Sequence, residues 1–188
     1  MNKYFRAIID FPTALIKTSF FKIYRFKSFK SSILSFMSPY SELTVDRGAK
    51  VIIGKNFRQR SQSRIRVRNG GELRVGKNIS LNHGCMIVSR EKIVIGDDVQ
   101  FGPNVFLYDH DHDYKTEGGI SSGKYKTSPI IIEKDVWLGA GTIVLRGTKI
   151  GAGSVVAAGS VIKGCFPRNS LIYQPKETNV RVHNINSV

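Results

Sequence analysis

The sequence is short of acidic residues, cysteine and long apolar runs, and each shortage excludes a class of protein. Only 14 Asp and Glu oppose 29 Lys and Arg, so the net charge is +15 and we expect an anionic partner. Two cysteines, Cys85 and Cys165, are too few for a disulfide framework, and we expect both to be buried free thiols. No run approaches the ~20 apolar residues of a transmembrane helix, and Asp10 and Pro12 interrupt any signal peptide, which predicts a cytoplasmic protein.

Glycine is missing from the first 47 residues, whereas all 18 glycines lie at or after Gly48. The glycine-free segment mixes aromatic with basic residues, and Asp10 with Pro12 predicts a helix start. We therefore expect residues 1–42 to form a basic, aromatic-rich helical segment. Two compatible roles stay open: residues 1–37 lie on an anionic membrane, or the apolar side of the helix caps the main domain. No nucleic-acid-binding module is recognisable, and we expect no nucleic-acid partner.

From Val51 onward the sequence repeats with a period of six. In the cleanest stretch an aliphatic residue occupies Ile132, Leu138, Val144, Ile150, Val156 and Ile162. Four residues after each of the first five comes a small or β-branched residue: Val136, Thr142, Thr148, Ser154 and Ser160. This period fits neither a helix, at about 3.6 residues, nor a strand, at about two. It fits a chain that turns a corner every six residues and closes a triangular coil after three faces.

In such coils each aliphatic residue points inward and stacks on its counterpart one coil away, ~4.8 Å along the axis. Glycine often follows the aliphatic residue, as at Gly54, Gly76 and Gly139, and we expect it there because it tolerates the dihedral angles of a tight turn. Several coils must stack before a core exists. The sequence predicts an all-β fold, a parallel β-helix over residues 43–172 with a tail over 173–188.

Three segments carry a resemblance to a known family: Val136-Trp137-Leu138-Gly139-Ala140-Gly141, Ile150-Gly151 with Gly159-Ser160-Val161-Ile162, and Pro167-Arg168-Asn169. Over about residues 53–175 the chain resembles the hexapeptide-repeat acyltransferases, most closely the branch that acetylates sugars, galactosides and antibiotics. The resemblance implies a left-handed parallel β-helix, acetyl-CoA as the donor and no metal. It also implies a homotrimer with an active site in each of three subunit clefts.

One long insertion interrupts the repeat between Leu107 and Ile130, and it begins Tyr108-Asp109-His110-Asp111-His112-Asp113-Tyr114. We expect residues 108–129 to form a loop extruded from the solenoid, and loops on a rigid scaffold commonly carry sites. In the family this loop holds the catalytic histidine, and counting from Val105 places His112 at its position. Imidazole suits the role, because a sugar hydroxyl needs a base to take its proton as it attacks a thioester.

The other predicted site residues follow from the same resemblance. Asp109, Asp111 or Asp113 would orient the imidazole, and the sequence leaves the choice open. The acceptor would contact Asn82, His110, Asp111 and Asp113. The pantetheine arm of acetyl-CoA would lie beside Trp137, Ala140 and Ala158, and its phosphates beside Lys163, Arg168 and Lys176. The chain departs from the family at Tyr173-Gln174-Pro175-Lys176, where many members have Gly-Asn-Pro-Ala, so the adenine contacts and the choice of acyl-CoA stay open.

Other functions fit parts of the pattern. A γ-type carbonic anhydrase uses three histidines on this scaffold, and His83, His110 and His112 would supply three nitrogens to zinc, although the family's wider spacing is not reproduced. A non-catalytic β-helix scaffold is a second alternative, against which the His112 loop argues. Among acetyltransferases the acceptor is open. It is a sugar hydroxyl in capsule, exopolysaccharide or lipopolysaccharide synthesis, or the amino group of a nucleotide-linked amino sugar.

Overall fold

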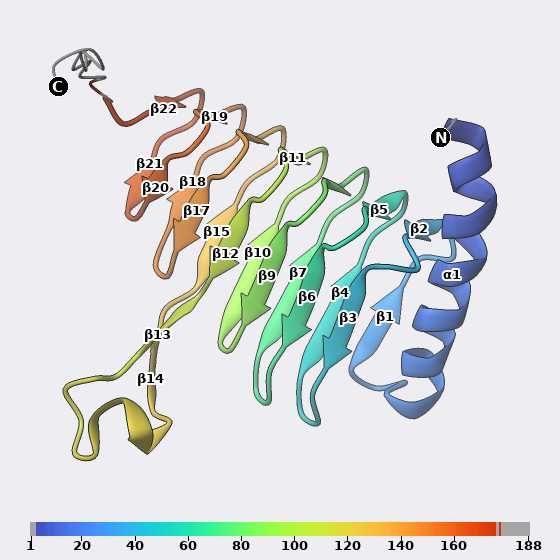
Figure 1. Cartoon of the computed structure of the whole chain (residues 1–188), viewed down its shortest axis with the longest axis horizontal. Coiled ribbons are helices and arrows are strands. Elements are labelled where there is room, and N and C mark those ends of the chain that lie inside the picture. The colour runs from blue at the N-terminus through green and yellow to red at the C-terminus, as the bar shows by residue number, and fades with distance from the viewer. Residues whose placement is uncertain (1–2, 176, 178–188) are drawn as a thin grey trace, which may run out of the picture.

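The computed structural model describes residues 3–175 and 177, in which one helix, α1 (Lys3–Tyr24), precedes a solenoid of three parallel sheets (Figure 1). The first sheet contains β1 (Phe29–Ser31), β4 (Lys50–Ile53), β7 (Glu72–Val75), β10 (Lys92–Ile95), β15 (Ile130–Ile132), β18 (Lys149–Ile150) and β21 (Cys165–Phe166). The second sheet contains β2 (Ser35–Met37), β5 (Phe57–Gln59), β8 (Ser80–Leu81), β11 (Gln100–Phe101), β16 (Trp137–Leu138), β19 (Val155–Val156) and β22 (Leu171–Ile172). The third sheet contains β3 (Glu42–Val45), β6 (Arg64–Val67), β9 (Met86–Ser89), β12 (Phe106–Tyr108), β17 (Ile143–Leu145) and β20 (Val161–Ile162).

Each coil takes one strand from each sheet in chain order, so that β1, β2 and β3 form coil 1 and β10, β11 and β12 form coil 4. An antiparallel hairpin of β13 (His110–His112) and β14 (Tyr125–Thr127), with the short helix η1 (Gly119–Ser122) between them, interrupts the solenoid after coil 4. The predicted parallel β-helix with an N-terminal helix and an extruded loop is confirmed.

The aliphatic positions of the repeat stack from coil to coil as predicted. Ile53 pairs with Val75, Val75 with Ile95, Ile95 with Ile132 and Ile132 with Ile150, and all five are at most 4% exposed. Burial of these branched side chains along the axis removes apolar area from water in every coil, which stabilises the stack.

The small polar residues of the hexads are buried at the corners. Thr142 and Thr148 are at most 1% exposed, and their hydroxyls donate to the carbonyl oxygens of Gly139 and Leu145 at 2.8 and 2.6 Å. A hydroxyl that bonds the backbone three residues earlier satisfies a buried polar group while it closes the turn. A hydroxyl therefore closes these corners, whereas Val136 fills the equivalent position with an apolar side chain.

The glycine that follows the aliphatic residue is required for a reason different from the predicted one. Gly139 does not have a positive φ; instead, a Cβ added there would lie 2.6 Å from the nitrogen of Ala158 and 2.7 Å from the oxygen of Val156. The close approach of the next coil therefore excludes a side chain. The left-handed dihedrals occur two residues later in the turn, where Asn56 after Gly54 has a φ of 58°.

The solenoid begins earlier than the boundary predicted at residue 42. α1 ends at Tyr24 and β1 begins at Phe29, so most of coil 1 lies inside the segment expected to be helical. In coil 1, Ser31 occupies the place that Ile53 fills in the next coil, and the hexad signal is therefore missing. Phe29 and Met37, at 2% and 0% exposed, fill the core of coil 1 instead.

α1 covers this end of the solenoid and packs on β2 and β1 (Figure 1). Capping was one of the two roles left open for this helix. The side that α1 turns inward centres on Asp10, Ala14 and Thr18, which are 6%, 1% and 2% exposed, and Phe21 packs against the core beside it. Lys17 fixes the helix by donating from Nζ to the carbonyl oxygens of Ser38 at 2.9 Å and Ser41 at 2.6 Å. Among the described residues, no helix has the length and apolar character needed to cross a bilayer.

The two cysteines differ. Cys85 is buried as expected, and burial raises the pKa of its thiol. Cys165 is exposed, so the expectation of two buried thiols is wrong for this residue. It pairs in register with Lys149, whose side chain also faces solvent, because both occupy the outward position of the first sheet.

Candidate active site

The extruded hairpin leaves the third sheet after β12 and returns to the first sheet at β15, between coils 4 and 5 (Figure 1). In the hairpin His110 lies opposite Thr127, and His112 lies opposite Tyr125. The insertion thus presents both histidines on a two-stranded arm, rather than on an irregular loop, at one corner of the solenoid.

Asp109 anchors the base of this arm. Its carboxylate is 0% exposed and accepts hydrogen bonds from Ser89 Oγ at 2.9 Å, Arg90 N at 2.8 Å and Glu91 N at 2.9 Å. Burial alone would raise the pKa of Asp109, but these bonds, together with one to His110, hold the pKa below its ordinary value. Asp109 is therefore a carboxylate at neutral pH.

The two histidines of the arm have different surroundings. His110 is 13% exposed, and its Nδ1 lies 3.1 Å from Asp109 Oδ1. Its ring packs edge-on against Tyr125, with centroids 5.4 Å apart. His112 is exposed and packs against the same tyrosine at 4.6 Å between centroids, with the two rings tilted by 42°. One histidine is therefore held by a buried carboxylate, and the other is open to solvent.

The two aspartates that flank His112 brace the arm in this chain. Asp111 Oδ2 accepts from Arg146 Nε at 2.5 Å, and Asp113 Oδ1 lies 3.1 Å from Lys126 Nζ. The Lys126 ammonium beside Asp113 lowers the pKa of that carboxyl. Of the three candidate aspartates, only Asp109 contacts a loop histidine among the described residues, and that histidine is His110.

Sequence reasoning missed two residues that support the arm, Arg90 and Tyr125. The Arg90 guanidinium lies over the Tyr125 ring at 3.5 Å from its centroid, so it supports the ring against which both histidines pack. Arg90 follows β9 in coil 3, about one coil before the insertion. The spacing of the repeat could have revealed Arg90, because residues 89–91 lie about one coil before Asp109 and therefore next to it in the stack.

Three of the six residues predicted to bind the acyl donor lie together along one edge of the solenoid. Trp137 is 56% exposed on β16, and Ala140 and Ala158 are exposed on the corners that follow β16 and β19 in adjacent coils. We call Trp137, Ala140 and Ala158 the donor ridge. Lys163 and Arg168 are exposed at the two other corners, after β20 and β21, and the structure does not bring them to the ridge. Lys176 lies outside the described residues.

Asn82 lies on the same edge as the donor ridge, at the corner that follows β8 in coil 3. Its Oδ1 accepts from the backbone nitrogen of His83 at 2.8 Å, and His83 Nδ1 lies 2.7 Å from Ser61 Oγ. The predicted site is therefore divided within one chain, with Asn82 and the donor ridge at one edge of the third sheet and the histidine arm at the other.

The outward side of the third sheet between these two edges is apolar in coils 3 to 5. Its side chains are all half-buried: Met86, Val88, Phe106, Tyr108, Ile143 and Leu145. We call these six residues the apolar face. The Tyr108 hydroxyl donates to Met86 Sδ at 3.2 Å, and burial raises the pKa of Tyr108. A flat apolar surface with a hydrogen-bonded tyrosine suits contact with another protein surface.

The carbonic anhydrase alternative needs three histidines in one cluster. Within the residues that the structure describes, no group of three His, Cys, Asp or Glu is arranged to hold a metal ion. His83 lies at the edge opposite His110 and His112 and is bonded to Ser61.

Comparisons with known proteins agree with the solenoid. Residues 129–164 match the family model described as bacterial transferase hexapeptide (six repeats). WbbJ of Escherichia coli, whose assigned role as a lipopolysaccharide biosynthesis O-acetyl transferase is itself provisional, is 34% identical over 127 residues, 63% of this chain and 65% of WbbJ. The galactoside O-acetyltransferase of Lactococcus lactis is 35% identical over 104 residues, 55% of this chain and 50% of that enzyme. The chain thus spans about half to two thirds of the length of these relatives.

One solved structure shows the same fold. AntD, an N-acyltransferase from Bacillus cereus in complex with dTDP and 3-hydroxybutyryl-CoA, superposes with a TM-score of 0.63 at 16% identity, over 78% of this chain and 79% of AntD. At that identity the likeness concerns the fold alone. Residues 129–164 thus match the hexapeptide repeat of bacterial transferases, and the chain is similar to named O-acetyltransferases over about half to two thirds of its length.

Proposed function

We propose that this protein is an acetyltransferase that moves an acetyl group from acetyl-CoA to a sugar hydroxyl in capsule, exopolysaccharide or lipopolysaccharide biosynthesis. The observation that carries the proposal is the histidine arm, held between coils 4 and 5 by buried Asp109. Sequence relatives named as galactoside and lipopolysaccharide O-acetyltransferases support the reaction and the acceptor class.

His112 is the proposed general base. It is exposed on the arm and packs against Tyr125 on one side, so an acceptor can reach its ring nitrogen. As the sugar oxygen attacks the thioester carbonyl, His112 takes the hydroxyl proton, and backbone N–H groups of a neighbouring coil stabilise the oxyanion. When the intermediate collapses, the C–S bond breaks and the imidazolium returns the proton to the departing CoA thiolate. The acetyl group passes directly to the acceptor without an acyl-enzyme.

Asp109 and His110 give a specific reason to consider a second base. A buried carboxylate that bonds one ring nitrogen holds an imidazole in one tautomer and stabilises its protonated form. Within the residues that the structure describes, His110 has such a partner and His112 has none. In our main proposal this pair positions the arm and contacts the acceptor, and His112 acts on the proton; in the second, the two histidines exchange these roles.

We also propose that the active enzyme is a homotrimer whose sites lie between copies. The donor ridge with Asn82 and the histidine arm lie at opposite edges of the third sheet, and the apolar face lies between them. A second copy packed on that face would bring its donor ridge to the arm of the first, in a closed heterologous ring. The small side chains of Ala140 and Ala158 leave room for the pantetheine arm. Lys163 lies at the same edge of the third sheet as the histidine arm, so the adjoining copy would bring its Lys163 toward the ridge as a cation for the phosphates of CoA, whereas Arg168 lies at the third corner.

The test is CoA release from acetyl-CoA with a panel of acceptors: simple galactosides, lipid-linked glycans and nucleotide-linked amino sugars. His112→Ala should lower kcat by about 10²–10⁴-fold while acetyl-CoA still binds. His110→Ala is the matched control, and we expect it to keep more activity than His112→Ala. The reverse order would make His110 the base. Activity confined to amino sugars would replace O-acetylation by N-acetylation. A protein that neither binds acetyl-CoA nor releases CoA would contradict the proposed activity.

A further inference from the structure

The outward side of α1 is apolar along its length. Helical geometry places one set of residues on the side opposite buried Asp10, Ala14 and Thr18. We call this set the α1 stripe, and its members are 38–73% exposed: Phe5, Ile8, Ile9, Ile16, Phe20 and Ile23. A surface helix of a globular protein normally turns its apolar side inward, so this patch marks an interaction surface.

The surroundings of the α1 stripe are basic. From residue 5 to residue 41 the only acidic residue is Asp10, which is 6% exposed. The positive residues in this segment are Arg6, Lys17, Lys22, Arg25, Lys27 and Lys30. Phe26, in the turn that follows α1, adds a further aromatic ring that is 68% exposed. Residues 5–41 at this end of the solenoid thus combine exposed apolar side chains with positive charge that no exposed acid of the same segment offsets.

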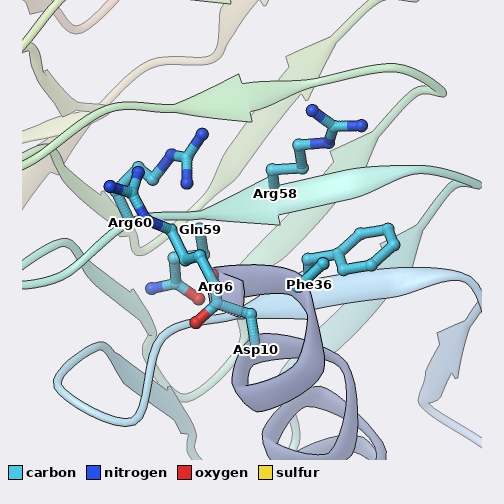
Figure 2. Close-up of a pocket in the computed structure, with 7 residues that line it drawn as sticks. Arg6, Asp10, Phe36, Arg58, Gln59 and Arg60 are labelled. Atoms are coloured by element: carbon cyan, nitrogen blue, oxygen red, sulfur yellow. The ribbon is translucent and has the colours of Figure 1, made fainter. Parts of the chain in front are cut away.

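A pocket beside α1 concentrates this charge. Arg6 comes from the helix, and Arg58 and Arg60 come from β5 and the residue after it, with Arg58 above the Phe36 ring at 5.5 Å (Figure 2). The adjoining cavity, of about 410 Å³, is also lined by Ile9 of the α1 stripe. Burial and the charge of Arg6 lower the pKa of Arg60, as expected for crowded cations.

These three arginines are unpaired. Some arginines of the described part of the chain form ion pairs, as Arg66 does with Glu42 and Arg146 with Asp111. The guanidinium groups of Arg6, Arg58 and Arg60 make no hydrogen bond or ion pair within the described residues, although the charge of Asp10 acts on Arg60. Guanidinium groups that line one pocket without ion-pair partners suit phosphate oxygens, which accept two parallel N–H bonds from one arginine.

We propose that the α1-covered end of the solenoid docks on a membrane that contains anionic phospholipids. The α1 stripe enters the boundary between headgroups and acyl chains, and Arg6, Arg58 and Arg60 bind lipid phosphates. An amphipathic helix with an apolar side and basic flanks binds such membranes through buried apolar area and attraction to anionic lipid. Because Lys17 fixes α1 to the solenoid, the stripe is presented without any refolding.

A second copy of this chain suits the surface less well. Two copies joined through the α1 stripe would bring two sets of basic flanks together, and juxtaposed like charges oppose association. An anionic bilayer complements both the apolar stripe and the charge around it. The docking requires no part of the proposed acetyl transfer, so the two proposals can fail separately.

Co-sedimentation with lipid vesicles tests the proposal on the full chain. The vesicles are phosphatidylcholine with phosphatidylglycerol, or phosphatidylcholine alone, at low and high salt. Wild type should bind the anionic vesicles and lose affinity as salt rises. The double variant Ile16→Asp, Phe20→Asp should bind at least about 30-fold more weakly, because two apolar side chains no longer leave water. Arg58→Ala and Arg60→Ala should each weaken binding about fivefold.

The matched control is Leu171→Asp, which changes a side chain that is 67% exposed at the opposite end of the solenoid. It should bind vesicles like wild type, and thermal unfolding should confirm that every variant is folded. Failure of wild type to bind anionic vesicles would overturn the proposal, as would equal binding by the stripe variant. Self-association that Phe20→Asp abolishes, without vesicle binding, would make the stripe an interface between copies instead.

Discussion

The solenoid and α1 use their apolar residues in opposite ways. In the solenoid Leu138 and Ile150 are 0% exposed, whereas on α1 Ile16 and Ile23 are 73% and 72% exposed and Thr18 is buried. The difference lies in what each element packs against. A coil closes on itself, so one position per hexad must point inward. The open end of coil 1 instead receives a helix side that mixes small and hydrogen-bonding residues with Phe21, which packs against the core at Phe29. A repeat therefore predicts burial more safely than the apolar side of a single helix does.

The largest effect expected from this comparison is on core packing. Leu138→Ala should lower the free energy of unfolding by about 2–5 kcal/mol, because it opens a cavity between stacked coils. Phe20→Ala, which removes a larger side chain from α1, should change it by no more than about 0.5 kcal/mol. Denaturant unfolding of the two variants measures both values. Comparable losses would show that the α1 stripe is packed against another part of the molecule.

A smaller effect is expected at the base of the histidine arm. Asp109→Asn should cost about 1–3 kcal/mol at neutral pH, because the buried donors of Ser89, Arg90 and Glu91 lose a charged acceptor. The folded pKa of Asp109 is below its ordinary value, so the stability that its carboxylate contributes is fully present above about pH 4 and is lost as pH falls toward the folded pKa. Thermal unfolding of wild type and variant should therefore converge in acid. A constant difference across pH would contradict the ionised state of Asp109.

The smallest effect on stability is expected at Asp10 of α1, where the substitution should stabilise the protein rather than destabilise it. Burial raises the pKa of Asp10, although Arg60, Arg6 and Lys17 lower it in part. Its carboxyl therefore favours folding most below the unfolded pKa, and this contribution is lost as pH rises through the folded pKa. Asp10→Asn should raise the melting temperature slightly at neutral pH and bring no gain in acid. A lower melting temperature at neutral pH would show that Asp10 is needed as a charged partner of the arginines.

Most of the fold could be predicted because the hexad leaves a mark in every regular coil. An aliphatic residue recurs every six positions from 132 to 162, and all six of these residues are buried in the stack. Coil 1 could not be found in the sequence, because Phe29 and Ser31 take the places of Val51 and Ile53 in the next coil. No glycine follows Ser31, so the hexad pattern is missing. The buried side of α1 could not be found either, since it depends on the carbonyl oxygens of Ser38 and Ser41 that Lys17 binds.

The candidate site was predictable in its parts but not in their placement. The interruption of the repeat indicated the arm that carries His110 and His112. The role of Asp109 depends on backbone nitrogens of Arg90 and Glu91 one coil away, and a linear sequence does not show which corner lies under an insertion. For the same reason the sequence placed Asn82 near the arm, whereas the coils put it at the opposite edge of the third sheet.

The most direct test of the central claim is complementation between two inactive variants. His112→Ala removes the proposed base, and Ala140→Trp blocks the donor ridge. If each site joins the arm of one copy to the ridge of the next, randomly mixed trimers should recover about one quarter of wild-type CoA release, because about a quarter of interfaces join two intact halves. Mixed trimers that are no more active than either variant alone would contradict a site shared between copies.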